Sequence, residues 1–228
     1  MKILKWAAAI ILTVLLLFST NSFALMLSDA PGYAAAWHAT PEWQYLGETE
    51  TADDGILWST NGGTTWGNEA VSIGDTVTFQ FEFWTAGYGV HTYDQLRAWA
   101  DTDHSMTFDV DEELLYIQQF KAPNNSIHNA SGVSQAQRDQ WNADFALTTL
   151  YTADLFITPE MADGFWLRSR VHCWHTPYPG LPATGYASQG EVEDWYVAVA
   201  PVPEPATMLL LGTGLVGLVG CGRRKLKK

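Results

Sequence analysis

A run of ten residues near the middle of the chain alternates strictly between two kinds of side chain. In Asp75–Trp84 (DTVTFQFEFW), every second residue from Val77 to Phe83 is apolar. This period of two predicts a β-strand with one buried face, because successive side chains of a strand point to opposite sides of the sheet. The chain must therefore build a sheet and bury one face of it.

Other stretches indicate the same class of fold. Phe165–Trp174 (FWLRSRVHCW) alternates again, with Arg168 and Arg170 on the face opposite its apolar residues, and Val192–Val199 predicts a last strand. Asn61, Gly62 and Gly63 form a turn signal. Short strands joined by turns rich in Gly and Pro predict a mainly β fold, an antiparallel β-sandwich of the immunoglobulin or jelly-roll kind.

One segment has a helical pattern. Ser134 is followed three residues later by Gln137, which fits a capping box, and Trp141 and Phe145 lie four residues apart. We expect a helix over 135–147, packed beside a sheet. It forms the middle of a short helical insertion at about 121–149.

The N-terminus has the three parts of a secretory signal. Lys2 and Lys5 are followed by an apolar run from Trp6 to Phe18, and small residues stand at Ser22 and Ala24. This order predicts a signal peptide over residues 1–24, removed on export and excluded from the fold.

The C-terminus carries a second targeting pattern. Residues 206–222 contain no charge and are followed by a cluster of Arg and Lys, so they predict a single transmembrane helix with its basic end in the cytoplasm. Together with Pro203, Glu204 and Pro205, these parts resemble the PEP-CTERM sorting signal, here over 201–228. The resemblance implies an exosortase as partner, in a Gram-negative bacterium, with export across the inner membrane, transient anchoring in the membrane, and release or retention at the cell surface.

The body between the two signals is strongly acidic. All 25 acidic residues except Glu204 lie within 25–203, against five basic residues. Such a surface repels nucleic acid and anionic lipid headgroups, so neither is an expected partner. Divalent cations and neutral polymers are more compatible partners.

One acidic stretch has the spacing of a calcium loop. Residues 101–113 (DTDHSMTFDVDEE) place oxygen-bearing side chains at the ligand offsets of a twelve-residue EF-hand loop, although Met106 stands where that loop has Gly. The flanks are typical of strands, which argues against an EF-hand proper. A Ca²⁺ loop between strands and a solvated acidic hairpin both stay open. The candidate ligands are Asp101, Asp103, Ser105, Thr107, Asp109 and Glu112.

The sequence GEVEDWY at Gly190–Tyr196 resembles the signature of the GEVED domain. The resemblance implies a β-sandwich module over 70–200, preceded by a leader with edge strands at 25–69, on a secreted or surface-anchored bacterial protein without an assigned activity. Glu191 and Glu193 share one face of the last strand. They either complete an ion's shell or pair with Arg168 and Arg170; a salt bridge is favoured for Glu193. Asp194 belongs to the same motif.

Signals for catalysis are weak: no nucleophile motif, zinc motif or phosphate loop occurs. We therefore expect a non-catalytic structural or binding protein of the cell surface or extracellular matrix, with Ca²⁺ as its one candidate cofactor. A carbohydrate-binding module for exopolysaccharide is the alternative, and a secreted hydrolase is a remote one. The rings proposed to stack on sugars are Trp58, Trp66 and Trp84.

Overall fold

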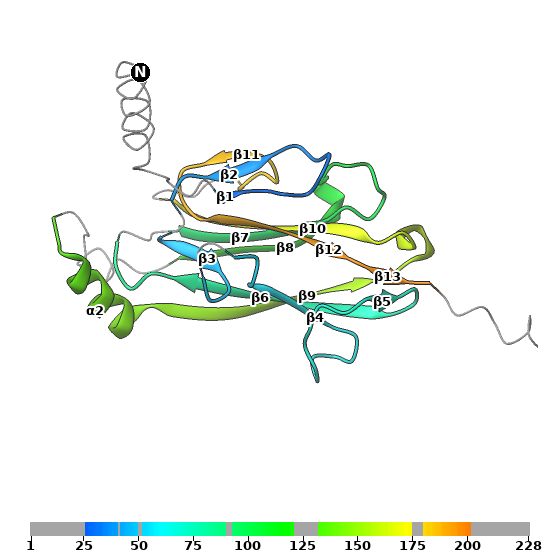
Figure 1. Cartoon of the computed structure of the whole chain (residues 1–228), viewed down its shortest axis with the longest axis horizontal. Coiled ribbons are helices and arrows are strands. Elements are labelled where there is room, and N and C mark those ends of the chain that lie inside the picture. The colour runs from blue at the N-terminus through cyan, green and yellow to red at the C-terminus, as the bar shows by residue number, and fades with distance from the viewer. Residues whose placement is uncertain are drawn as a thin grey trace, which may run out of the picture.

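The computed structural model describes residues 26–40, 42–49, 52–89, 93–120, 132–174 and 180–201. In this part of the chain the regular structure is mostly strand, arranged in open sheets with one α-helix (Figure 1). The prediction of a mainly β fold with antiparallel sheets is confirmed. Two short strand pairings, given below, are parallel, which the sequence did not predict.

Two sheets form the body of the molecule. In the first, the strand order is β12, β10, β7, β8, and all pairings are antiparallel. In the second, β6 is central and pairs with β3, β4 and β9, again antiparallel. The first sheet consists of Glu191–Val197 (β12), Phe165–Trp174 (β10), Tyr93–Ala100 (β7) and Glu113–Phe120 (β8). The second consists of Gln44–Leu46 (β3), Thr76–Thr85 (β6), Ile56–Ser59 (β4) and Leu147–Phe156 (β9).

The main core lies between these two sheets. The inward residues of β6, from Val77 to Phe83, are at most 1% exposed, as their alternation predicted. They belong to one apolar cluster with Leu96 of β7 and with Leu167 and Val171 of β10. Burial of this apolar surface is the main force that holds the sheets together.

A small third sheet covers the outer face of the first sheet (Figure 1). In it, Ala36–His38 (β2) pairs antiparallel with Met26–Leu27 (β1) and parallel with Gly185–Ala187 (β11). Arg168 and Arg170, expected on a polar face, are consequently fully buried. A second parallel pairing joins Val199–Ala200 (β13) to Val71–Ser72 (β5).

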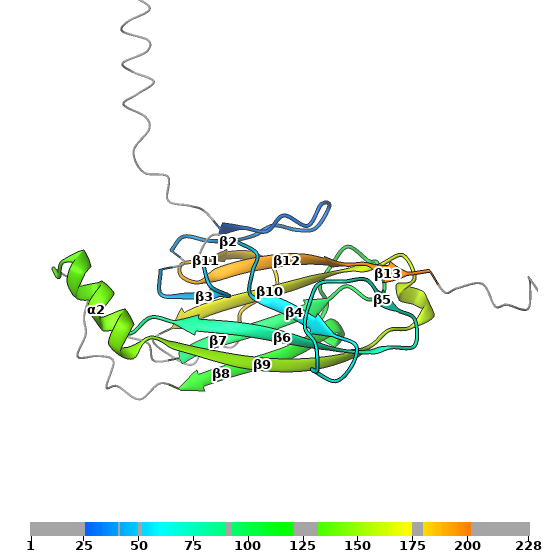
Figure 2. The same cartoon turned by 60° about the horizontal axis from the view of Figure 1, so that its bottom comes forward.

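The one α-helix of the described residues lies at one end of the sandwich (Figure 2). It spans Gln135–Phe145 (α2), and Ser134 caps it by accepting a hydrogen bond from the Gln137 amide, as the sequence predicted. It ends two residues before the predicted boundary, because Leu147 begins β9. Short 3₁₀ turns occur at Val110–Glu112 (η1) and Pro159–Met161 (η3).

The predicted targeting segments fall outside the described residues. Their structures therefore remain predictions from the sequence. These segments are the signal peptide at 1–24, the sorting residues Pro203, Glu204 and Pro205, and the transmembrane helix at 206–222. Within the described ranges, no helix combines the length and apolar character that crossing a bilayer requires.

Candidate functional site

The acidic loop connects β7 to β8, so it is held by two neighbouring strands of the first sheet. Asp101 follows the last residue of β7, and its amide donates to the carbonyl of Trp166 in β10. Glu112 closes η1 just before β8. The loop thus lies between strands, as its flanks predicted.

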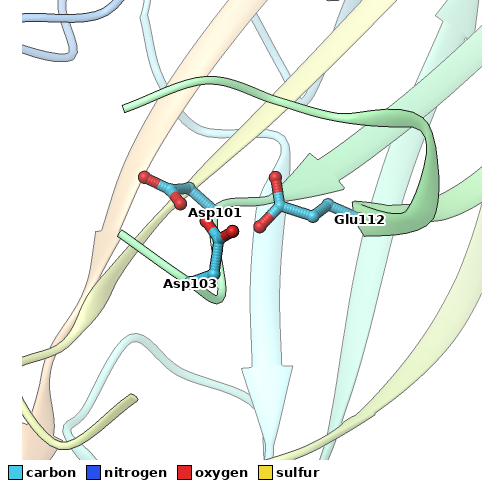
Figure 3. A group of neighbouring side chains, drawn as sticks. All are labelled: Asp101, Asp103 and Glu112. Atoms are coloured by element: carbon cyan, nitrogen blue, oxygen red, sulfur yellow. The ribbon is translucent and has the colours of Figure 1, made fainter. Parts of the chain in front are cut away.

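Three carboxylates converge inside this loop. Asp101, Asp103 and Glu112 each offer an oxygen, and these oxygens lie within 4.8 Å of one another (Figure 3). Ca²⁺ binds oxygens at about 2.3–2.6 Å, so two ligands on opposite sides of one ion lie up to about 5 Å apart. The three carboxylates therefore fit around a single hard cation.

Asp101 organises the loop from its buried position. Its Oδ1 accepts a hydrogen bond from the Ser105 amide and its Oδ2 accepts one from the Met106 amide, each at 3.1 Å. The hydroxyl of Tyr33 also donates to Oδ2. Because an ionised carboxylate has about four acceptor positions, these three bonds leave one position for a cation.

Glu112 closes the loop from the other side. Its Oε1 accepts from the Thr102 amide at 2.7 Å, and its Oε2 accepts from the Asp109 amide at 3.0 Å. Burial raises the pKa of Glu112, with a smaller contribution from the charges of Asp101 and Asp103. A bound cation would reverse this trend, because it neutralises the mutual repulsion of the carboxylates.

The backbone of the acidic loop turns sharply without glycine. Met106 has a φ of 62° and His104 has a φ of 59°, both in the left-handed region. Such a conformation costs a non-glycine residue about 1 kcal/mol or more. Met106 stands where an EF-hand loop has glycine, but its side chain does not prevent the turn.

The remaining predicted ligands form a chain of hydrogen bonds along the loop. The hydroxyls of Ser105 and Thr107 are 2.7 Å apart, and Thr107 donates to Asp109 at 3.1 Å. The structure therefore brings three of the six predicted side chains to one point and aligns the other three beside them.

The structure explains why the GEVED-like motif begins with a glycine, Gly190. Its φ is 92°, and a Cβ at this position would lie 1.9 Å from the carbonyl oxygen of Val171. Only glycine avoids both the strain and this clash.

The acidic residues of the motif fasten the N-terminal part of the chain to the body. Glu191 accepts a hydrogen bond from the Leu46 amide at 2.5 Å, and Glu193 accepts from the Gly55 amide at 3.0 Å. Asp194 accepts from the Ala30 amide at 2.9 Å. Each buried carboxyl group thus satisfies a backbone donor of a segment far away in sequence.

The prediction that Glu193 forms a salt bridge with Arg168 or Arg170 is wrong. Arg168 pairs instead with Asp194, through Nε–Oδ1 at 2.7 Å and Nη2–Oδ2 at 2.8 Å, and both side chains are fully buried. Ser169 is the cross-strand partner of Glu193, so Glu191 and Glu193 point to the face opposite Arg168. No group of metal-ligating side chains in the described ranges includes Glu191 or Glu193.

Arg170 is held in a different way. Its guanidinium donates to the carbonyls of Pro182, Thr184 and Gly185, and Nε contacts the His38 ring. It therefore anchors the segment leading into β11.

The three tryptophans proposed as sugar platforms have different environments. Trp58 is 4% exposed, and its indole donates to the Glu69 carbonyl at 2.8 Å, so this ring has no open face for a sugar. Trp66 is half-buried in the hairpin after β4, where it packs on Gly63. Trp84 is half-buried at the end of β6, where it lines a cleft.

That cleft, of about 430 Å³, lies between β3, the end of β6 and α2. Trp84 stacks on its cross-strand neighbour Tyr45, with ring centroids 4.3 Å apart and planes at 13°. Sequence reasoning missed Tyr45, and no local pattern assigns α2 to this place. The other residues lining the cleft are Glu42, Glu48, Thr49, Tyr88, Gln135 and Asn142.

A larger cleft of about 490 Å³ lies beside the acidic loop. Arg97, the charged side chain among those lining it, donates twice to Glu113 and once to the carbonyl of Leu181. The other residues that line this cleft are mainly apolar and aromatic, including Tyr33, Trp99 and Phe108. This cleft offers little polar chemistry.

Residues 201–225 match the PEP-CTERM protein-sorting motif, which confirms the prediction made from Pro203, Glu204 and Pro205. No curated protein matches the chain. The motif implies processing by an exosortase and export to the cell surface or the extracellular space.

Proposed function

We propose that this exported protein is a non-catalytic structural or binding component of the cell surface or extracellular matrix, and that Ca²⁺ stabilises it. The observation that supports Ca²⁺ best is the convergence of Asp101, Asp103 and Glu112 within 4.8 Å inside a loop that hydrogen bonds already hold in place. Hard carboxylate oxygens suit Ca²⁺, and the remainder of its shell would come from loop oxygens and water.

We further propose that residues 70–200 form a GEVED domain of the immunoglobulin or jelly-roll kind, with the leader at 25–69 fastened to it. This proposal is supported by the role of the motif: Gly190 fits a position that only glycine tolerates, and Glu191 and Asp194 bind amides of the leader.

Calcium should raise the thermal stability of the purified protein. An ion present at about ten times its Kd stabilises the folded state by about 1.4 kcal/mol, which corresponds to about 3–6 °C in Tm for a domain of this size. We expect this shift with Ca²⁺ in the millimolar range, where extracellular calcium modules bind. Differential scanning calorimetry with and without a chelator measures it.

The variant Asp103→Asn tests the site with little risk to the fold, because Asp103 is exposed. It should abolish most of the calcium-dependent shift, whereas Asp144→Asn, which removes an exposed carboxylate on α2, should retain it. An equal shift in both variants, or no shift in the unmodified protein, would refute the calcium site.

Carbohydrate binding is a second candidate function, favoured by the stacked rings of Tyr45 and Trp84 in a cleft that also contains amide and carboxylate groups. Aromatic rings flanked by a few polar groups are typical of small-ligand sites. In this proposal the protein binds an exopolysaccharide without cleaving it.

Trp84→Ala should weaken binding of a soluble exopolysaccharide by about tenfold or more, since a buried aromatic contact of this kind contributes about 2 kcal/mol. Trp66→Ala, outside the cleft, is the matched control and should bind normally. Isothermal titration calorimetry gives the affinities, and analysis of the recovered polymer detects cleavage. Equal affinities would place binding elsewhere, and hydrolysis by the pure protein would contradict the non-catalytic assignment.

A further inference from the structure

The cleft at Trp84 is acidic as well as aromatic. Glu42, half-buried, and Glu48, exposed, both line it. Glu82 lies two residues before Trp84 on the same outward face of β6. In the described part of the chain none of these three carboxylates forms a salt bridge. Glu42 and Glu48 therefore give the cleft carboxylates that no salt bridge among the described residues neutralises.

The other groups at the cleft are held in fixed positions. The Asn142 side chain accepts a hydrogen bond from the Gly87 amide at 3.0 Å, which joins α2 to the segment after β6. Trp43 and Trp141 pack against Tyr88, which lines the cleft, and the three rings belong to a small second apolar cluster. Trp84 packs against this cluster, and Tyr45 and Trp84 both lie on strands rather than on a loop.

Among the described residues, the basic side chain of Arg138 lies close to this region. The Arg138 guanidinium is 5.7 Å from the centre of the Tyr88 ring, against which it packs. It does not line the cleft, whereas Glu42 and Glu48 do. Both charged side chains that line the cleft among the described residues are therefore acidic, in agreement with the formal net charge of −13 for the whole chain.

Aromatic rings together with carboxylates favour some classes of sugar over others, according to the charge of the sugar. A neutral sugar gains stacking and hydrogen bonds here, and an acidic sugar is repelled by the carboxylates. A sugar with a protonated amino group gains the same stacking, a charge-assisted hydrogen bond to a carboxylate, and attraction to the ring faces. We propose that the cleft binds a polysaccharide of hexosamine units with free amino groups, in preference to the N-acetylated form. This inference rests on the carbohydrate-binding function proposed above.

The decisive experiment uses two ligands that differ only at the nitrogen. Calorimetric titration of the mature protein with glucosamine oligomers and with N-acetylglucosamine oligomers of equal length should show at least tenfold tighter binding of the free amines. Higher salt should reduce this preference, because it screens the partly exposed carboxylates.

Variants separate charge from stacking. The double change of Glu42→Gln and Glu48→Gln should bring the two affinities close together, and Trp84→Ala should weaken both. Equal affinity of the unmodified protein for the two oligomers, or tighter binding of the acetylated one, would overturn the amine preference and leave carbohydrate binding standing. Failure to bind either oligomer would overturn both proposals.

Discussion

Replacing Asp194 by Asn will lower the free energy of unfolding by about 3–5 kcal/mol, because it leaves the Arg168 guanidinium buried without its counter-charge. Both side chains are fully buried and joined by two hydrogen bonds. Arg168 also donates to the carbonyls of Ala34 and Ala183. Loss of the charge at Asp194 therefore weakens the attachment of the small third sheet as well. Urea unfolding of the purified variants measures the change.

A matched control is available on the neighbouring strands. Arg97 and Glu113 also form a two-bonded pair, but their side chains are 16% and 18% exposed. Glu113→Gln should therefore cost only about 1 kcal/mol, since water screens the pair. A cost of Asp194→Asn as small as this would mean that the buried pair is not a main determinant of stability.

The double variant Arg168→Met with Asp194→Leu provides a further check. Replacing a whole buried ion pair by apolar side chains is often nearly neutral, whereas breaking it is costly. We expect the double variant to be more stable than Asp194→Asn alone. The difference would show that the cost of the single change comes from the unpaired charge and not from lost packing.

The strands could be predicted well because their pattern is local. The alternation from Val77 to Phe83 defines the buried face of β6, and Phe165–Trp174 coincides with β10. The burial of Arg168 and Arg170 could not be predicted in the same way. A polar face normally indicates solvent, and only the tertiary structure shows that β2 and β11 cover this one.

The residues of the candidate metal site are also close together in the sequence, whereas those of the cleft are far apart. Asp101, Asp103 and Glu112 lie within one loop, so their spacing alone suggested that they meet. The cleft joins Tyr45, Trp84 and Asn142 from three distant segments. Of these, only Trp84 was selected from the sequence, together with Trp58, whose ring the core buries.

The stability of this protein should fall as the pH rises, and Glu191→Gln should remove a large part of that dependence. Glu191 is fully buried, and burial, followed by repulsion from Glu193, raises its pKa to about 10. Its Oε2 accepts from the Leu46 amide, while Oε1 has no hydrogen-bond partner among the described residues. Ionisation of this carboxyl in the folded state is therefore unfavourable.

The direction of this pH dependence follows from the linkage between proton binding and folding. The folded state holds the Glu191 proton up to about pH 10, whereas the unfolded chain releases it above its ordinary value near 4.5. The contribution of this group to stability is complete below about pH 4.5 and is lost as the pH rises toward 10, at up to about 1.4 kcal/mol per pH unit. Glu193, whose pKa burial raises to about 8, adds a similar loss over a narrower range.

Glu191→Gln keeps the size of the side chain and the oxygen that accepts from Leu46, but it cannot ionise. It should therefore be close to the unmodified protein in stability at about pH 5 and several kcal/mol more stable at about pH 9. Glu193→Gln should also flatten the pH profile but should lower stability at acid pH. Its two carboxyl oxygens accept from three N–H groups, those of Asp54, Gly55 and Trp195, and the amide nitrogen of Gln cannot accept. Urea unfolding across this pH range decides the matter: parallel profiles for Glu191→Gln and the unmodified protein would show that Glu191 is ionised in the folded state, with a cation or water compensating its charge.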